Sequence, residues 1–315
     1  MTIDVIIPTY NNARFLKEAI ASVQSQTYQP VQIIVVDDGS TDDTEAVVKH
    51  ISDNRIVYIK KENGGPNSAR NAGLAHATAE LVAFLDADDR WEPTKLAQQV
   101  ALFEQDTEKT LGLVYANYNI IDTDGHERSD IPTVPLDTQV RGMAFEALLP
   151  GNLILGSASN VLIRRSVFDT VGVFDETLRV GEDWDMWLRI AREFRIDYVD
   201  QVLVSIRRHG GNTTNDVSKL ITGDSAFIET WIPRIHGQYP IPKIWGDRIV
   251  FNIVRGLPSL RNFALAKRSL SPQTRKVVFP AGSIVLACVM FVLRALTNSD
   301  MRKRMLASLK RYAAR

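Results

Sequence analysis

Short runs of apolar, mostly β-branched residues recur four times in the first 86 positions, at Ile3–Ile7, Val31–Val36, Ile56–Ile59 and Leu81–Leu85. Such nearly continuous apolar runs are typical of strands that are buried on both faces of a parallel sheet. The segments between them have the periodicity of amphipathic helices, which is clearest from Asn12 to Gln26. The pattern therefore predicts a series of βαβ units: an α/β fold with a Rossmann-like, mostly parallel sheet flanked by helices.

The alternation of strands and helices loosens after Leu85. We predict a helix at 93–105, a strand at 113–118, a turn-rich stretch at 122–137 and another strand at 159–163. A further predicted helix, from Glu182 to Phe194, has Asp183 in its first turn, on the same face as large apolar residues. The positive end of that helix favours an ionised Asp183 whereas burial opposes it, so the two effects compete.

The last part of the chain differs in charge from the rest. The composition, 45% hydrophobic and 23% charged, excludes a disordered or fibrous chain of 315 residues. Residues 1–240 carry 22 basic and 35 acidic side chains and residues 241–315 carry 15 and 2, although the formal net charge of the chain is zero. Val277–Leu293 has no charge over 17 residues, slightly short of the roughly 20 that a membrane-spanning helix needs. The basic, amphipathic segment Met301–Arg315 then ends the chain.

Two interpretations fit this C-terminal segment. In the first, 277–315 associates with an anionic membrane surface; in the second, its apolar part packs on the body of the protein and its basic helix is solvated. Nucleic-acid binding is disfavoured, because the basic residues lie beside aliphatic rather than stacking aromatic side chains. The single cysteine, Cys288, excludes an intrachain disulfide, and Met1–Pro8 has no secretory signal pattern. We therefore expect a cytoplasmic protein, peripheral on the cytoplasmic face of the membrane.

Polar side chains follow three of the predicted strands at the point where each strand ends. They are Pro8-Thr9-Tyr10-Asn11 after the first, Asp37-Asp38-Gly39-Ser40 after the second and Asp86-Ala87-Asp88-Asp89 after the fourth. Because ligands bind beyond the carboxyl ends of the strands of an open parallel sheet, these carboxylates converge on one binding edge. Hard oxygen ligands favour Mg²⁺ or Mn²⁺, so Asp86 and Asp88 form a candidate metal site, for which a diphosphate is a natural ligand.

Helix caps and solvated turns are the alternative explanation for these carboxylates. That explanation is preferred for Asp42 and Asp43, and for Asp89 as a cap or structural partner, and it is as good as the functional one for Asp38. The glycine-containing segment Asn63–Arg70, ahead of a helix, adds a flexible loop and a guanidinium near the same edge.

Taken in order, these segments resemble the family 2 glycosyltransferases, which have the A-type glycosyltransferase fold. The resemblance covers about residues 1–210 and rests on five blocks, which are Val5-Ile6-Ile7-Pro8-Thr9-Tyr10-Asn11, Ile34-Val35-Val36-Asp37-Asp38-Gly39-Ser40-Thr41-Asp42, Asn63-Gly64-Gly65 with Ser68-Ala69-Arg70-Asn71-Ala72-Gly73, Phe84-Leu85-Asp86-Ala87-Asp88-Asp89 and Gly181-Glu182-Asp183-Trp184-Asp185. One block is weak evidence, whereas five in a consistent order are specific. We therefore expect a glycosyltransferase domain at 1–215, with a donor-binding half at about 1–110 and an acceptor half at about 111–215, ahead of a largely helical C-terminal region, 216–315.

The resemblance also implies roles for individual residues. It implies a nucleotide-binding set, with Asp37 on the base edge, that consists of Pro8, Thr9, Tyr10, Asp37, Asp38, Arg70 and Asp86. Asp88 would hold a Mn²⁺ or Mg²⁺ ion that bridges the diphosphate, with Asp86 as a second ligand or a ribose contact. His209 is a candidate third ligand or diphosphate contact, because some relatives have a histidine at this position; a histidine in a glycine-containing loop is otherwise simply exposed.

Transfer to a hydroxyl requires a group that removes the proton of that hydroxyl, and a carboxylate within hydrogen-bond reach is the simplest agent. Asp183 is our candidate base, and the Glu-Asp motif of the family points to the same residue. Glu182 and Trp184 are candidate acceptor-side or supporting residues, with helix capping and core packing as the alternatives.

These features predict an inverting glycosyltransferase that moves a sugar from a nucleoside diphosphate, most often UDP in this family. The expected acceptor is a hydroxyl of a saccharide or lipid-linked glycan in cell-surface polysaccharide biosynthesis. A nucleotidyltransferase or a dehydrogenase would need a glycine-rich motif after the first strand, where Pro8-Thr9-Tyr10-Asn11 stands. A catalytically idle, membrane-bound partner of a glycan assembly complex is the remaining alternative, which loss of Asp88 or Asp183 would have favoured.

Overall fold

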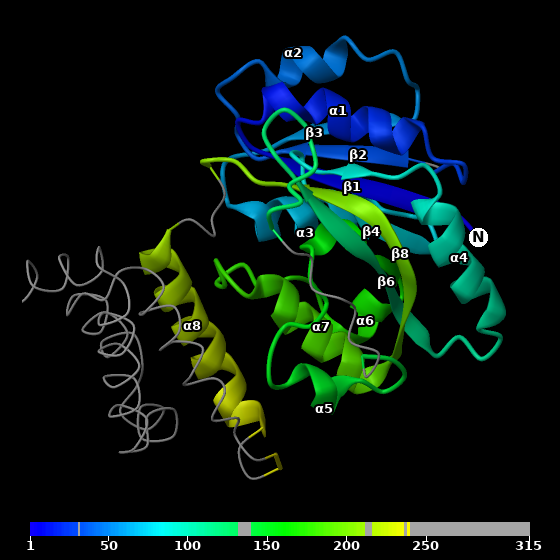
Figure 1. Ribbon diagram of the computed structural model, residues 1–315, viewed down its shortest axis with the longest axis vertical. Helices are drawn as coiled ribbons and strands as arrows, with labels where there is room; N and C mark the ends of the chain where they lie inside the picture. Colours follow the sequence, from blue (N-terminus) through cyan, green and yellow to red (C-terminus); the bar gives the residue numbers. More distant parts are fainter. Residues whose placement is uncertain (31, 132–139, 212–215, 236–237, 240–315) are drawn as a thin grey trace, which may run out of the picture. The chain divides into compact units, whose positions relative to one another are not determined.

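A mixed sheet forms the middle layer of the unit that consists of Met1–Thr177 and Glu182–Gly210 (Figure 1). The computed structural model describes residues 1–30, 32–131, 140–211, 216–235 and 238–239. In that part of the chain the eight strands lie in the order β3-β2-β1-β4-β7-β6-β8-β5. The strands are β1 (Ile3–Thr9), β2 (Gln32–Asp37), β3 (Ile56–Lys60), β4 (Leu81–Phe84), β5 (Arg90–Trp91), β6 (Leu111–Ile121), β7 (Leu162–Arg164) and β8 (Arg195–Arg207).

Helices flank this sheet, which confirms the predicted α/β architecture. In Figure 1, α1 and α2 lie above β1 to β3, and α3 lies below them. The helices are α1 (Ala13–Gln24), α2 (Thr44–Lys49), α3 (Pro66–His76), α4 (Lys95–Gln105), α5 (Phe145–Leu148), α6 (Val167–Val171), α7 (Glu182–Glu193) and α8 (Val217–Ile235), and a 3-10 turn, η1, spans Ala158–Asn160.

The first four predicted strands are confirmed and are parallel to one another. β1 pairs with β2 on one side and with β4 on the other, and Thr9 lies opposite Asp37 at the end of the first pair. β2 pairs in turn with β3. Parallel pairing brings the carboxyl ends of all four strands to one edge of the sheet, where the polar segments begin.

Alternate residues of these strands pack on opposite faces of the sheet. Val5 and Val35 belong to a buried cluster with apolar residues of α1 and α4. On the other face, Gly73 of α3 lies against Ile6, since a methyl group at Gly73 would be 2.4 Å from Cγ2 of Ile6. Both faces are thus covered, as the unbroken apolar strands require.

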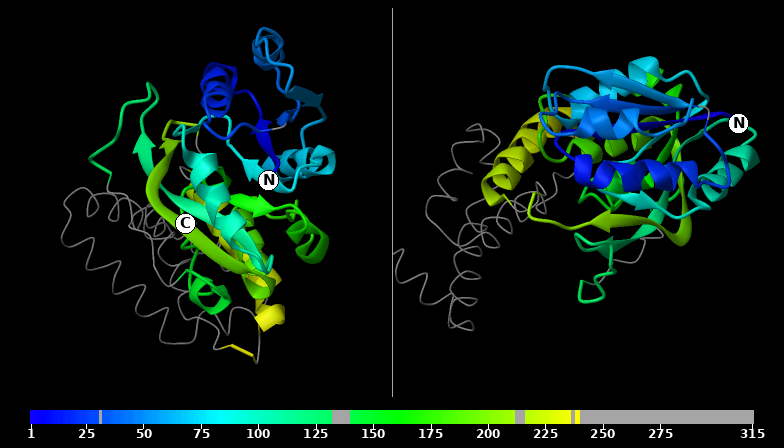
Figure 2. Two further views of the ribbon diagram at one scale, coloured as in Figure 1. Left: turned by 90° about the vertical axis from the view of Figure 1, so that its right-hand side faces the viewer. Right: turned by 90° about the horizontal axis from the view of Figure 1, so that it is seen from above.

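The second half of the sheet contains antiparallel pairs. β7 is antiparallel to β4 and β6, and β6 runs parallel to β8 over a long stretch, which Figure 2 shows as two neighbouring ribbons. The strand predicted at 159–163 begins later than expected: Ala158–Asn160 form η1 and the strand is Leu162–Arg164. Ser159 and Asn160 face the interior and bind other segments through their side chains, which the apolar pattern did not reveal.

Leu178–Gly181 and the described residues from Gly211 onward belong to a second unit. Its described helix is α8, whose Gly223 lies so close to Val180 that a methyl group there would be 2.3 Å from Cβ of Val180. None of the helices that the structure describes is long and apolar enough to cross a membrane. The predicted membrane-associating segment, 277–315, and Cys288 lie outside the described residues.

Replacing Gly73 by Ala tests the close packing of α3 on β1. The clash with Ile6 costs about 1–3 kcal/mol in a tightly packed core, and the better helix propensity of Ala returns only about 1 kcal/mol. We expect a lower free energy of unfolding, measured by urea denaturation. Gly151→Ala is the control, because a methyl group at Gly151 meets no atom within 4 Å; equal stability of the two variants would contradict this packing.

Candidate active site

The carboxyl ends of β1 and β2 carry Thr9 and Asp37 side by side. Asp37 is fully buried, and its carboxylate accepts hydrogen bonds from the backbone N–H of Ser40 at 2.7 Å and from the hydroxyl of Tyr58. Burial and the hydrogen bond to Asp37 raise the pKa of the Tyr58 hydroxyl, so Tyr58 stays a donor. Because Asp37 is buried, a contact with a nucleotide base would require the residues around its carboxylate to move. Its role in nucleotide binding stays a prediction.

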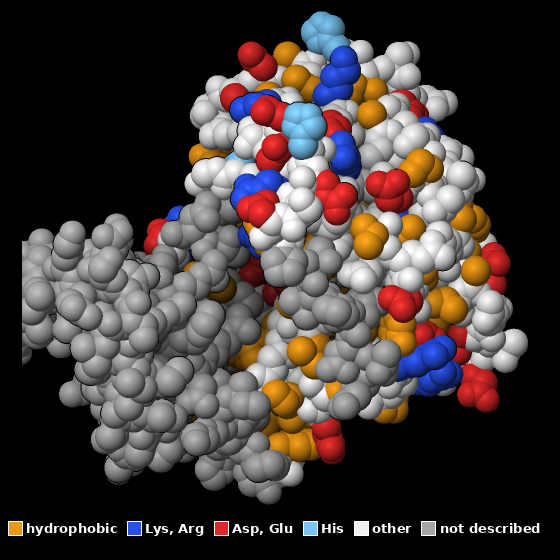
Figure 3. All heavy atoms as spheres, in the orientation of Figure 1, with side chains coloured by type: hydrophobic (Ala, Val, Ile, Leu, Met, Phe, Trp, Pro, Cys, Tyr) orange, Lys and Arg blue, Asp and Glu red, His pale blue; other side chains and the backbone are white. Residues whose placement is uncertain are grey.

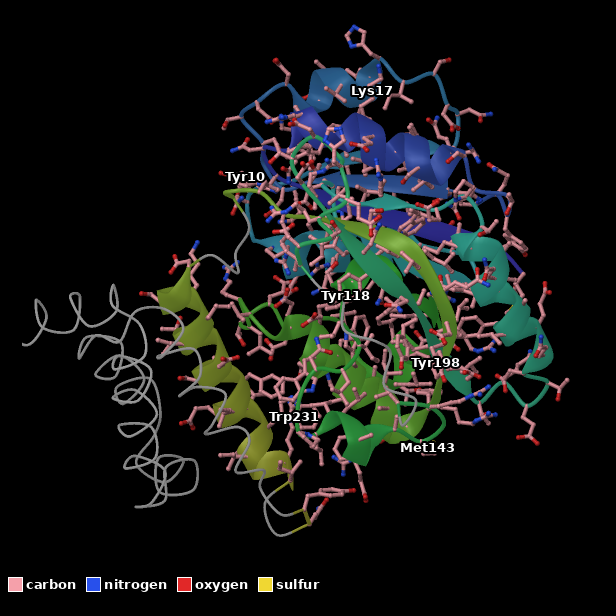
Figure 4. The ribbon with its side chains drawn as sticks, viewed as in Figure 1. Tyr10, Lys17, Tyr118, Met143, Tyr198 and Trp231 are labelled. Carbon is pink, nitrogen blue, oxygen red and sulfur yellow. The ribbon has the colours of Figure 1, made fainter. Side chains whose placement is uncertain are left out.

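The remaining predicted residues of β1 differ in exposure. Pro8 is buried in the strand, and Oγ1 of Thr9 is buried without a described hydrogen-bond partner. Tyr10, just beyond the strand (Figure 4), is 49% exposed. Tyr10 is therefore the member of this predicted set that is open to a ligand in the structure.

Asp38 anchors a loop. Its carboxylate accepts hydrogen bonds from the backbone N–H groups of Gly64 and Gly65 and from Nζ of Lys61, at distances between 2.6 and 3.2 Å. Asp38 is 2% exposed, and a lysine balances its charge. It holds the segment that leads into α3, where Gly65 adopts a φ of 92° that favours glycine.

Arg70 on α3 connects two parts of the sheet edge. Its guanidinium donates to Oδ1 of Asp86 at 2.9 Å and lies 3.5 Å from Oε1 of Glu182. Nη1 of Arg70 also donates a hydrogen bond to Oδ1 of Asn67, one turn earlier in α3, at 3.2 Å. Burial alone would lower the pKa of this guanidinium, but the charges of Asp86 and Glu182 outweigh burial and raise it. A permanently charged group therefore lies between the loop after β4 and the start of α7.

Asp86 and Asp88 lie in that loop, as predicted. Oδ2 of Asp88 is 2.9 Å from Nε2 of His209, and both side chains are less than one-fifth exposed. Burial and the charge of Asp86 raise the pKa of the Asp88 carboxyl, whereas His209 opposes the shift. The structure thus pairs Asp88 with His209, whereas Asp86 contacts Arg70. The metal role of these three residues stays a prediction.

Asp89 differs from its two neighbours because it points into the protein. Its carboxylate accepts hydrogen bonds from Oγ of Ser159 at 2.6 Å and from the backbone N–H of Arg207 at 2.9 Å. Burial, with the charges of Asp88 and Asp86, raises the pKa of Asp89 well above its ordinary value. This geometry supports the structural reading of Asp89.

The Glu-Asp pair lies at the start of α7. Oδ1 of Asp183 accepts the backbone N–H of Trp184 at 2.7 Å, and Oδ2 accepts Nδ2 of Asn152 at 3.1 Å. Burial and the neighbouring charge of Asp183 raise the pKa of Glu182, although Arg70 acts in the opposite direction. Trp184 is buried, with its indole N–H on the carbonyl of Leu148, so it supports the motif through packing.

The donor set around Asp88 fits a hard divalent cation. No group of three or more His, Cys, Asp or Glu side chains in the described part of the chain forms a complete metal site. Mg²⁺ and Mn²⁺ sites that also bind phosphate need only one or two protein carboxylates, since water and phosphate oxygens fill the other positions. The paired Asp88 and His209, with Asp86 in the same loop, satisfy that requirement.

Three residues of this site escaped the sequence analysis. Tyr58 could have been found from the sequence, because it lies in a predicted strand of the sheet. The hydroxyl of a tyrosine in such a place usually has a hydrogen-bond partner. Asn152 and Ser159 had no detectable signal, since the partner of each is a carboxylate 31 or 70 positions away.

Comparisons with known proteins agree with this geometry. The family model of glycosyl transferase family 2 matches residues 4–172. An uncharacterized glycosyltransferase of Rickettsia prowazekii is 33% identical over 68% of this chain, which spans 66% of that relative, just under two thirds of its length. The Escherichia coli UDP-Glc:alpha-D-GlcNAc-diphosphoundecaprenol beta-1,3-glucosyltransferase WfaP is 40% identical over 38% of this chain and 46% of its own length.

Solved structures show the same fold at low sequence identity. The Staphylococcus aureus TarS 1-349 complex with UDP-GlcNAc has a TM-score of 0.60 and 19% identity, over 88% of this chain and 82% of that one. The mannosyltransferase PcManGT from Pyrobaculum calidifontis, solved with GDP-Man and Mn²⁺, has a TM-score of 0.57 and 21% identity, over 92% and 86%. The predicted A-type glycosyltransferase fold is confirmed.

Replacing Glu182 by Gln tests the charge arrangement around Arg70. A carboxyl whose pKa is raised by folding stabilises the native state at low pH, and that stabilisation is lost as pH rises through the folded pKa. Wild-type protein should therefore lose stability relative to Glu182→Gln between about pH 4.5 and neutrality. Thermal unfolding across this range measures the difference, with Glu193→Gln at the other end of α7 as control. Parallel curves for Glu182→Gln and the wild type would contradict the shift.

Proposed function

The chain belongs to glycosyl transferase family 2, and on that premise we propose that it is an inverting enzyme that takes its sugar from UDP. The acceptor is a hydroxyl of a saccharide or lipid-linked glycan, in cell-surface polysaccharide biosynthesis. One observation carries the proposal: Arg70 contacts both Asp86 and Glu182, so the loop after β4 and the Glu-Asp pair of α7 belong to one site.

The choice of UDP is supported by sequence similarity. The relative WfaP is named for a UDP-glucose donor and a diphosphoundecaprenol-linked acceptor, and the similarity covers 38% of this chain. TarS was solved with UDP-GlcNAc, whereas PcManGT was solved with GDP-Man, so the fold alone does not select the nucleotide. Screening nucleotide sugars for turnover with this protein identifies the donor.

Asp88 and His209 would hold a Mn²⁺ or Mg²⁺ ion, with Asp86 beside them. Such an ion, when bound, offsets the negative charge that builds on the departing diphosphate. The chain contributes a paired carboxylate and imidazole that are both largely withdrawn from solvent. Arg70 then adds a fixed positive charge next to Asp86, on the side of the Glu-Asp pair.

Asp183 acts as the general base. The acceptor oxygen forms its bond to the anomeric carbon while the bond from that carbon to the diphosphate breaks, and the nucleoside diphosphate leaves with the electron pair. The acceptor proton passes to Asp183, whose carboxylate is oriented by Asn152 and by the backbone N–H of Trp184. A single displacement of this kind inverts the anomeric configuration.

The wider organisation completes the proposal. Residues 1–215 form the transferase domain, with donor binding in about 1–110 and acceptor binding in about 111–215. The basic segment 277–315 would bring this domain to the cytoplasmic surface of a membrane, where a lipid-linked acceptor is available. A catalytically idle partner is not favoured, since the proposed metal ligand Asp88 and the proposed base Asp183 are both present.

Calorimetric titration with UDP, with and without Mn²⁺, tests the donor site. We expect binding that depends on Mn²⁺ and is weakened at least about tenfold by Asp88→Asn, since loss of a ligand or of its orienting partner costs 10- to 100-fold in metal affinity. Asp43→Asn is the control, an exposed carboxylate ahead of α2. Unchanged binding by Asp88→Asn would refute the assignment of the metal site.

Replacing Asp183 by Asn tests the base. Its rate of sugar transfer should fall by about 10²- to 10⁴-fold, the usual contribution of general base catalysis, while UDP binding stays intact. Glu193→Gln, in the last turn of the same helix, should retain activity. Full transfer by Asp183→Asn would mean that another group removes the proton.

A further inference from the structure

Arg207, at the end of β8, makes several side-chain hydrogen bonds within the protein. Its Nε donates to the carbonyl of Asp88 at 2.8 Å, and Nη1 donates to the carbonyls of Asp122 and Thr123, both at 3.1 Å. Nη2 donates to Oε2 of Glu18 at 2.5 Å. The side chain is 1% exposed. All three guanidinium nitrogens of Arg207 are therefore engaged within the protein.

Contacts of Arg207 hold the backbone on either side of the Asp88–His209 pair. The side chain of Arg207 bonds the main chain of Asp88, and the backbone N–H of Arg207 bonds the side chain of Asp89. His209 follows two residues later, and its ring lies 5.2 Å from the ring of Phe15. The guanidinium of Arg207 lies over the same ring at 4.9 Å. Arg207 and His209 thus share one aromatic support on α1 while holding the same loop.

The charge of this buried guanidinium needs a partner, because an unpaired charge in such a place is strongly unfavourable. Glu18 on α1 supplies a carboxylate to it. The same carboxylate accepts a hydrogen bond from Nη1 of Arg90 at 3.0 Å, and Nη2 of Arg90 donates to the carbonyl of Gly125. Glu18 therefore joins two arginines that both hold the turn at 122–125, although its side chain is 42% exposed.

We propose that Glu18 is a positioning residue of the active site, which acts through Arg207 to hold Asp88 and His209 in register. The inference rests on the proposed function for its catalytic meaning. Glu18 belongs to none of the segments that carry the binding or catalytic residues, and its contact with Arg207 spans 189 positions of sequence. Neutralising Glu18 removes the carboxylate that balances the buried charge of Arg207. The contacts of Arg207 with the loop 86–89 then weaken, and the end of β8 is held less firmly against that loop.

An ordinary surface ion pair is the competing explanation. Acidic and basic side chains are interspersed over the α1 and α2 side of the face seen in Figure 3, and exposed pairs contribute little. Glu45 on α2 provides the matched control. It also receives two cations, Lys49 at 2.6 Å and Lys60 at 3.1 Å, and its side chain is 39% exposed, but neither lysine contacts the loop 86–89 in the bonds recorded.

The test compares Glu18→Gln with Glu45→Gln in the full chain by two measurements. The first is Mn²⁺ binding in the presence of UDP, followed by electron paramagnetic resonance of the free ion. We expect an affinity about tenfold lower for Glu18→Gln, as for loss of an outer partner of a metal ligand, and no change for Glu45→Gln. The second is hydrogen exchange of the metal-free proteins, in which amides at 207–208 should exchange faster in Glu18→Gln alone.

The outcomes separate this inference from the proposed function. Equal Mn²⁺ affinity and equal exchange in the two variants would overturn the positioning role. If the wild type shows no Mn²⁺-dependent binding of UDP, the proposed donor site fails, and the exchange data alone then decide whether Glu18 holds β8 to the loop. Arg207→Lys, which keeps the charge but loses the multiple donors, should reproduce both effects where it folds; normal affinity in that folded variant would also overturn the inference.

Discussion

The site depends on the ion pairs of the buried Arg70 guanidinium with Asp86 and Glu182. It lies on α3, which packs on the first strands of the sheet, and it reaches Asp86 at the end of β4 and Glu182 at the start of α7. Two carboxylates this close to a desolvated cation compensate its charge, and the cation in turn keeps them from repelling each other. Without it, the side of the site that we propose binds the diphosphate and the side with the proposed base would have no charged link.

Interior polar contacts define the loop between β4 and β5. Asp89 turns inward to Ser159 and Arg207, and its two neighbours in the loop turn toward His209 and Arg70. Three carboxylates in four positions would repel each other in water-poor surroundings, and each of them has a donor or cation of its own. The three carboxylates of this loop therefore differ in environment because each contacts a different partner.

The family motifs supplied most of the candidate site residues, but a motif records positions rather than orientations. Asp37 and Asp38 are adjacent in the chain, yet one is bonded to Tyr58 and Ser40 and the other anchors the glycine loop through Lys61 and backbone N–H groups. Nothing in the order of residues distinguishes two consecutive aspartates at the end of a strand. The direction of each side chain is set by the pleat of the strand and by the loop that packs over it.

The chain itself determined the first four strands, their crossover helices and the edge on which the acidic residues gather, because apolar periodicity and turn residues act over short distances. Only the tertiary structure decided that 158–160 is a 3-10 turn, that Asn152 orients Asp183 and that Glu18 compensates Arg207. The last two are contacts of single polar side chains over 31 and 189 positions. Such contacts leave no periodic trace in a sequence, since one hydrogen bond constrains one residue and not its neighbours.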